Sequence, residues 1–229
     1  MRWKLWPICS ASTFTDIDMR KKLFESPFMD ALSNAIDVVW AGMLWIVCSL
    51  PIITVGAASQ ALYYCIAKCV RRQRGTLTAS FFKAFRSNFK HATLIWLIYL
   101  AYVIIGIIDL RLVLEVFPGS SLLTALTVTA FFPVLITLPW IFAYVSRFEN
   151  RTMDSIKYTF FISIRNIGRT LVLVILLAAW FFVAWLIPLS FVFLPGVICL
   201  LMSFFIEPSF RAITTKIASD ENADQWYNE

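Results

Sequence analysis

Long apolar runs recur along this chain, and they constrain its fold more than any other feature. Runs of about 18 residues or more alternate with short polar or basic stretches, and each is long enough to cross ~30 Å of hydrocarbon as a helix. Of the 229 residues, 60% are hydrophobic and only 15% are charged, whereas a soluble domain of this size needs far more polar surface. The pattern predicts an all-α, polytopic membrane helix bundle.

We place six transmembrane helices on these runs. The break between the first two falls at Pro51, and the turn between the last two falls at Pro188 or at Pro195. Within the fourth run, Pro133 and Pro139 each lack a backbone donor, so we expect kinks at both. The approximate bounds of the six predicted spans are 31–50, 54–70, 93–108, 122–145, 170–187 and 191–206.

The predicted membrane domain covers residues 23–217, with tails on either side. Residues 1–22 lack the continuous apolar core of a secretory signal, and Met19 is followed at once by three basic residues. Either Met1 or Met19 could therefore be the start of translation, and we expect 1–22 to form an N-terminal tail. Residues 218–229 are expected to form a polar C-terminal tail.

The distribution of basic residues predicts how the chain is threaded. All of the 20 Lys and Arg residues except Arg111 fall in the N-terminal segment, the connections 68–90 and 147–169, or the segment that follows the last span. Six spans place these four regions on one side of the membrane, and by the positive-inside rule that side is the cytoplasm. We therefore expect a multi-pass plasma-membrane protein with both termini cytoplasmic. The net charge of +6 then reflects orientation, and nucleic acid is not predicted as a partner.

Small side chains mark one face of the second span. Close backbone approach along small residues supplies much of the packing between helices in lipid, so this stripe predicts a helix-packing face. Two cysteines one turn apart could bind a metal, but the span contains neither a histidine nor a third cysteine. Packing is therefore the preferred interpretation, and we predict no metal or cofactor. The stripe consists of Gly56, Ala57, Ala61, Cys65 and Cys69.

Two basic connections, 71–91 and 146–169, are predicted to form cytoplasmic amphipathic helices that repeat one another. A shift of about 79 residues superimposes their sequences, which indicates a parallel internal repeat. Each helix could lie among lipid headgroups or could dock a cytoplasmic partner, and periodicity does not separate the two. The candidate interface residues are Arg71, Arg72, Phe81, Phe82, Phe85, Arg86, Phe89, Arg147, Glu149, Arg151, Phe160, Phe161 and Arg165.

The titratable residues do not form a recognisable catalytic constellation. Asp37 lies about one turn inside the first span, at headgroup depth or at a functional site. His91 is the single histidine, expected in a solvated or headgroup-facing position, and alone it makes neither a metal site nor a triad. We therefore predict no enzymatic activity.

Three sequence blocks resemble one family. Cys48 to Ala58, Phe81 to Lys90 and Arg147 to Asn150 are similar to the signature blocks of the YesL-like bacterial integral membrane proteins. This resemblance implies a domain of unknown function, associated with carbohydrate ABC transporters and two-component regulators. It leads us to expect a non-catalytic accessory or regulatory component of carbohydrate uptake, with the lipid bilayer and an ABC sugar permease or a sensor kinase as partners. A small-molecule transporter in its own right is the alternative, and the sequence does not indicate the oligomeric state.

Overall fold

The computed structural model describes residues 27–71, 76–117, 119–148 and 151–217, and every regular element in these ranges is helical. The chain divides into two compact units, Met1–Asp37 and Val38–Glu229. The described part of the first unit is the beginning of α2 (Pro27–Ser49). All described residues from Val38 onwards belong to the second unit. The predicted tails 1–22 and 218–229 lie outside the described residues.

Six helical stretches are long and apolar enough to cross a membrane, which confirms the predicted all-α membrane fold. These stretches are Leu32–Ser49, Ile52–Val70, Phe89–Val116, Ser121–Val145, Ile167–Leu186 and Phe193–Phe210. The third is much longer than predicted, because α5 (Phe89–Val116) continues as one helix through Asp109 and Arg111. At 1.5 Å per residue, α5 extends about 42 Å.

Pro51 ends α2, as the sequence predicted, and Thr54 stabilises the turn that follows. A 3-10 turn (Ile52–Thr54) leads directly into α3 (Val55–Cys65). Thr54 Oγ1 lies 2.6 Å from the carbonyl oxygen of Cys48 and 2.7 Å from that of Pro51. The hydroxyl can thereby satisfy the Cys48 carbonyl at the end of α2, which no longer has a helical donor, whereas the Pro51 carbonyl also accepts the backbone N–H of Thr54.

The other prolines behave differently from one another. The fourth apolar run consists of α6 (Ser121–Ala130) and α7 (Phe132–Val145), which are interrupted just before Pro133, whereas Pro139 lies inside α7. The turn between α9 (Ile167–Leu186) and α10 (Ser190–Ile217) contains Pro188. Pro195 lies inside α10, so of the two predicted positions for this turn only the one at Pro188 is observed.

The sequence repeat has a counterpart in the fold. Helix α4 (Leu77–Ser87) packs on α3 and α5, and α8 (Thr152–Arg165) packs on α7 and α9 in the same way. Asn88 ends α4 and begins α5, and Asn166 occupies the same place between α8 and α9. A membrane helix, a short amphipathic helix and a second membrane helix therefore occur twice in the same order.

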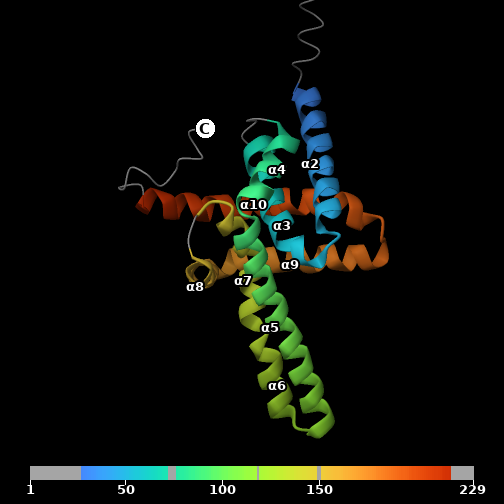
Figure 1. Cartoon of the computed structure of the whole chain (residues 1–229), viewed down its shortest axis with the longest axis vertical. Helices are drawn as coiled ribbons and strands as arrows, with labels where there is room; N and C mark the ends of the chain where they lie inside the picture. Colours follow the sequence, from blue (N-terminus) through green and yellow to red (C-terminus); the bar gives the residue numbers. More distant parts are fainter. Residues whose placement is uncertain (1–26, 72–75, 118, 149–150, 218–229) are drawn as a thin grey trace, which may run out of the picture. The chain divides into compact units, whose positions relative to one another are not determined.

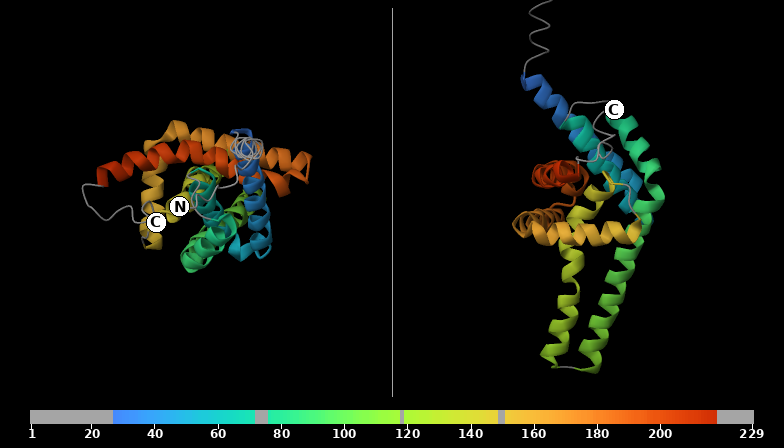
Figure 2. Two further views of the ribbon diagram at one scale, coloured as in Figure 1. Left: turned by 90° about the horizontal axis from the view of Figure 1, so that it is seen from above. Right: turned by 90° about the vertical axis from the view of Figure 1, so that its left-hand side faces the viewer.

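The helices of the second unit do not form a parallel bundle. Helices α5 and α6 form a long hairpin, whereas α9 and α10 run across the direction of that hairpin (Figures 1 and 2). Helix α3 lies in the middle of this arrangement, because it packs on α4, α5, α7 and α10. Its central place explains why the second span is the most buried of the six.

Candidate functional site

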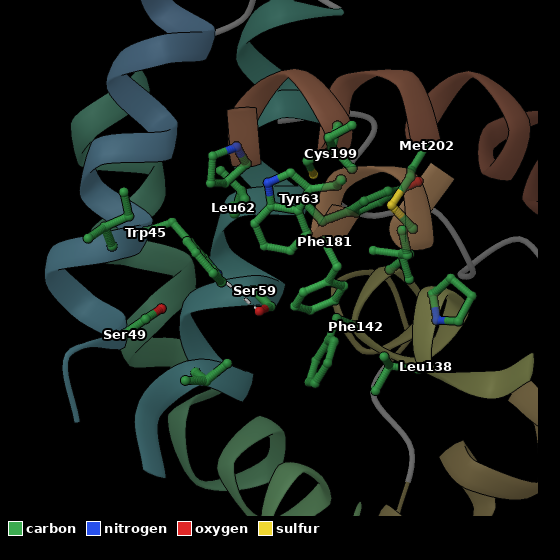
Figure 3. A pocket seen from close by; sticks show the side chains of 18 of the residues that line it. Trp45, Ser49, Ser59, Leu62, Tyr63, Leu138, Phe142, Phe181, Cys199 and Met202 are labelled. Carbon is green, nitrogen blue, oxygen red and sulfur yellow. Dashed lines mark hydrogen bonds between the residues drawn. The ribbon is translucent and has the colours of Figure 1, made fainter. Parts of the chain in front are cut away.

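The principal candidate site is a cavity of about 510 Å³ among the membrane helices. Side chains from α2, α3, α7, α9 and α10 reach this space (Figure 3), and Trp96 of α5 completes the wall. The volume lies within the range of small-molecule sites, about 300–1,000 Å³. Because both halves of the internal repeat contribute to the wall, the cavity forms only when the whole unit is folded.

Aromatic rings build one side of the cavity. The ring of Trp180 stacks on that of Phe191 with centroids 5.5 Å apart, and the edge of Trp45 meets Trp180 at 6.1 Å. These three rings come from α9, α10 and α2. Trp45 is further oriented by a 3.0 Å hydrogen bond from its Nε1 to Ser59 Oγ on α3. Ring pairs of this kind are each worth about 0.5–1.5 kcal/mol beyond the area they bury, so this wall is pre-formed.

Three residues that line the cavity each have a buried polar atom with no hydrogen-bond partner among the described residues. These atoms are Ser49 Oγ, Tyr63 Oη and Trp180 Nε1, and all three are covered by protein and do not open into the cavity. A buried polar atom without a partner costs about 1–3 kcal/mol, so native proteins rarely retain several in one place. None of the residues that line the cavity is charged.

The predicted helix-packing stripe lies at the centre of the unit. Gly56, Ala57, Ala61, Cys65 and Cys69 are all buried. Residues four apart drift by about 40° per step around an α-helix, yet Cys69 still faces the interior. The π turn Ile66–Val70, closed by a 3.1 Å bond from Arg71 N to Ile66 O, reverses this drift, and the neighbouring residues Ile66, Ala67 and Val70 are buried as well. The sequence gives no signal for such a turn.

Three of the predicted interface residues are engaged inside the protein, so we correct their assignment. Phe81 is completely buried against α3. Arg71 donates a 2.8 Å hydrogen bond to the Ser203 carbonyl oxygen and lies over the ring of Phe204. Arg147 forms a buried ion pair with Glu207. The physical reason is the same in each case, because these side chains leave their helices on the face that packs against α3 or α10.

The remaining interface candidates lie on outer faces or are partly covered. The exposed ones are Phe82, Arg86, Arg151, Phe161 and Arg165, and the half-buried ones are Phe85, Phe89 and Phe160. Arg72 and Glu149 lie outside the described residues. His91, for which we expect a solvated or headgroup-facing position, is half-buried in the first turn of α5. Asp37 lies in the part of α2 that belongs to the first unit.

Sequence reasoning missed the polar contacts that fix α10. Besides Arg71 and Arg147, Arg169 of α9 donates a 2.6 Å hydrogen bond to Ser209. Three arginines from the ends of three helices therefore meet one stretch of α10, residues 203–209. One signal was available, because Glu207 is the first acid after a long apolar run, just beyond the predicted end of the last span.

The six long apolar helices define the class of this molecule: an integral multi-pass membrane protein whose biochemical activity is not established. Residues 38–110 match the family model described as "Protein of unknown function, DUF624". The match includes two of the three sequence blocks noted above and agrees with the expected domain of unknown function. No curated protein and no solved structure matches the chain.

Proposed function

We propose that this chain is a non-catalytic accessory or regulatory component of a carbohydrate uptake system in a bacterial plasma membrane. Both termini would be cytoplasmic, and the partner would be an ABC-type sugar permease or a sensor kinase. The resemblance to the YesL-like proteins supplies the physiological context, which is an association and not a mechanism. The observation that supports a docking role is the composition of the outer face of α8.

The outer face of α8 combines exposed apolar side chains with cations. Its inner face is made of Ser155, Thr159 and Ser163, small polar residues that are completely buried. The opposite face carries Met153, Tyr158, Phe161 and Ile164 together with Arg151, Lys157 and Arg165, all of them exposed. Aromatic residues, Met and Arg are enriched at protein interfaces, and a rigid helix presents them without further ordering cost. The position of the helix at a basic connection supports a cytoplasmic partner.

Site-specific photocrosslinking in native membranes tests this proposal. A photoreactive amino acid at Phe161 of α8 is expected to yield one discrete adduct with a permease or kinase subunit. The same amino acid at Leu126 of α6 is the matched control, because both side chains are 69% exposed. If Phe161 gives only lipid adducts, or the same protein adducts as Leu126, the docking proposal is wrong.

A small-molecule transporter is the second candidate, and the cavity between the two repeats favours it. The cavity lining argues against a sugar as the cargo. A pyranose has about five hydroxyl groups that each need a partner when buried, whereas the indole N–H of Trp45 is already bonded to Ser59 and that of Trp96 to the Ile52 carbonyl. Liposomes that contain the purified chain and take up a labelled small molecule faster than empty liposomes would support this second candidate over the first.

A further inference from the structure

We propose that the acidic segment 218–229 of this chain docks on the outer face of α8 and covers it. The regulatory consequence rests on the proposed docking role of that face, because the segment then competes with the cytoplasmic partner. The contact itself lies within one chain and can be tested without any partner. Three observations carry it: the exposed cations and apolar side chains of α8, the composition of 218–229, and the contacts that hold α10 at both ends of α8.

The cations on the outer face of α8 have no counter-ion among the described residues. Arg151, Lys157 and Arg165 are exposed, and none of them takes part in the buried ion pair between Arg147 and Glu207 or in another ion pair within the described ranges. They surround apolar side chains such as Phe161, which is also exposed. Electrostatic complementarity favours an occupant that is acidic and carries aromatic or apolar groups as well.

Residues 218–229 have this complementary composition. The chain contains 20 Lys and Arg residues and 14 Asp and Glu residues, yet this segment contains four acids and no Lys or Arg. Trp226 and Tyr227 stand between the last two of these acids, and aromatic residues of this kind provide much of the binding energy at interfaces. The four acids are Asp220, Glu221, Asp224 and Glu229.

The contacts of α10 place the start of this segment within reach of α8. Arg147, just before α8, is paired with Glu207, and Arg169, just after α8, is bonded to Ser209. From Ser209, α10 continues to Ile217, which is about 12 Å of helix, and its last turns lie on the side of the unit where α8 lies (Figures 1 and 2). Twelve residues extend up to about 40 Å, whereas α8 is about 21 Å long. The segment can therefore reach the whole outer face.

Helix α4, the equivalent helix of the first repeat, is a poorer site. Phe82 is the single large apolar side chain that α4 exposes, whereas α8 exposes four. Arg71, before α4, contacts α10 at Ser203, about 9 Å further from the end of α10 than Ser209. Helix α4 is nevertheless a useful control, because Arg86 and Arg165 correspond in the repeat and both are exposed in the last turn of their helices.

A tethered segment competes efficiently even when its contact is weak. Linkage in one chain gives it an effective concentration on the order of millimolar. A contact of modest affinity is therefore enough to cover the outer face of α8 in the isolated protein, and a partner that binds more tightly displaces it. Loss of negative charge in 218–229 should expose the face and favour the partner.

Intramolecular photocrosslinking tests the contact. Benzoylphenylalanine in place of Trp226 keeps an aromatic side chain, and the full chain is studied in phosphatidylcholine nanodiscs with one chain per disc. Irradiation is expected to join position 226 to the α8 peptide 152–165 in preference to the α4 peptide 77–87. Raising NaCl from about 50 mM to about 500 mM should lower the yield several-fold, because exposed charges are then screened. Crosslinks to lipid alone, or equally to α4 and α8, would overturn the proposal.

A matched pair of substitutions tests the charge complementarity. Arg165→Glu is expected to lower the yield of the crosslink to α8 about twofold to tenfold, since it removes one exposed attraction and adds a repulsion. Arg86→Glu makes the same change at the corresponding position of α4 and should leave the yield unaltered. An unchanged yield in Arg165→Glu, or an equal loss in both variants, would contradict the proposed contact.

The regulatory consequence is tested in native membranes with the photoreactive amino acid at Phe161. Replacing the four acids of 218–229 by Asn and Gln is expected to raise the yield of the partner adduct about twofold to tenfold, because the competing charge pairs are lost. An unchanged yield would show that the segment does not compete.

The two experiments separate this inference from the proposed function. A crosslink from position 226 to α8 without any partner adduct at Phe161 would leave the intramolecular contact standing and make the docking role wrong. A partner adduct at Phe161 without a crosslink from position 226 to α8 would leave the docking role standing and overturn the present inference.

Discussion

Gly56 allows α3 to approach α5 more closely than any other residue would. A Cβ atom at this position would lie 2.6 Å from the Ala92 carbonyl oxygen and 2.5 Å from Trp96 Cβ. Neither atom belongs to the flexible end of a side chain, so the two helices would have to separate. The same approach brings Trp96 Nε1 to within 2.7 Å of the Ile52 carbonyl oxygen.

We therefore expect Gly56→Ala to destabilise the protein by about 1–3 kcal/mol, the usual cost of overpacking. The control is Gly168→Ala in the first turn of α9, where a Cβ would meet nothing within 4 Å. Because alanine is the better helix former, that change should be neutral or stabilising by up to about 1 kcal/mol. Thermal unfolding in detergent, followed by size-exclusion chromatography, compares the two. Equal midpoints would contradict the close approach.

The Arg147–Glu207 pair is a structural contact, and its two partners should behave as a unit. Removing one partner of a buried ion pair leaves an uncompensated charge and costs about 3–5 kcal/mol, whereas replacing both by apolar residues is often neutral. We expect Arg147→Met and Glu207→Leu each to lower stability strongly and the double variant to recover most of the loss. Arg151→Met, at an exposed position, is the control for loss of positive charge. Additive losses in the double variant would show that the pair does not act as one.

At the scale of single elements, α4 places two adjacent phenylalanines in different surroundings. Phe81 is completely buried against α3, and Phe82 is 42% exposed. Phe81→Ala should therefore cost about 3–5 kcal/mol, while Phe82→Ala should change stability little. Thermal unfolding of the two variants measures the difference directly. A similar loss for both would mean that α4 does not pack on α3 as described.

This pair also shows what the sequence could and could not predict. Hydrophobic periodicity correctly indicated an amphipathic helix but not the different surroundings of Phe81 and Phe82. Apolar length correctly located six helices that are long and apolar enough to cross a membrane. Periodicity could not show whether Phe81 contacts lipid or protein. Both surroundings are apolar, so the hydrophobic effect does not favour one over the other. The cavity was equally hidden, since Trp45, Tyr63 and Trp180 come from three separate helices and share no spacing.

At the scale of the whole molecule, the turns between the helices lie at different levels. The Ile52 carbonyl contacts Trp96, and α5 continues for about 20 residues beyond that contact, which is about 30 Å and therefore the thickness of the hydrocarbon core. The turn between α2 and α3 exposes Leu50, Ile52 and Ile53. The turn between α5 and α6 contains Gly119, with a φ of +99°, and Ser120, and it also exposes Phe117. The glycine and serine make this turn the more polar of the two.

We therefore expect the α2–α3 hairpin to enter the membrane and return on the same side, while the α5–α6 hairpin crosses it. The basic connections remain cytoplasmic in this arrangement, because a hairpin that enters the membrane and returns has both of its ends on the same side. An impermeant maleimide applied to whole cells should label Ser120→Cys quickly and Ile53→Cys hardly at all, in a background without the native cysteines. Lys157→Cys should react only after the membrane is permeabilised. Fast external labelling of Ile53→Cys would show instead that α2 and α3 each cross the membrane completely.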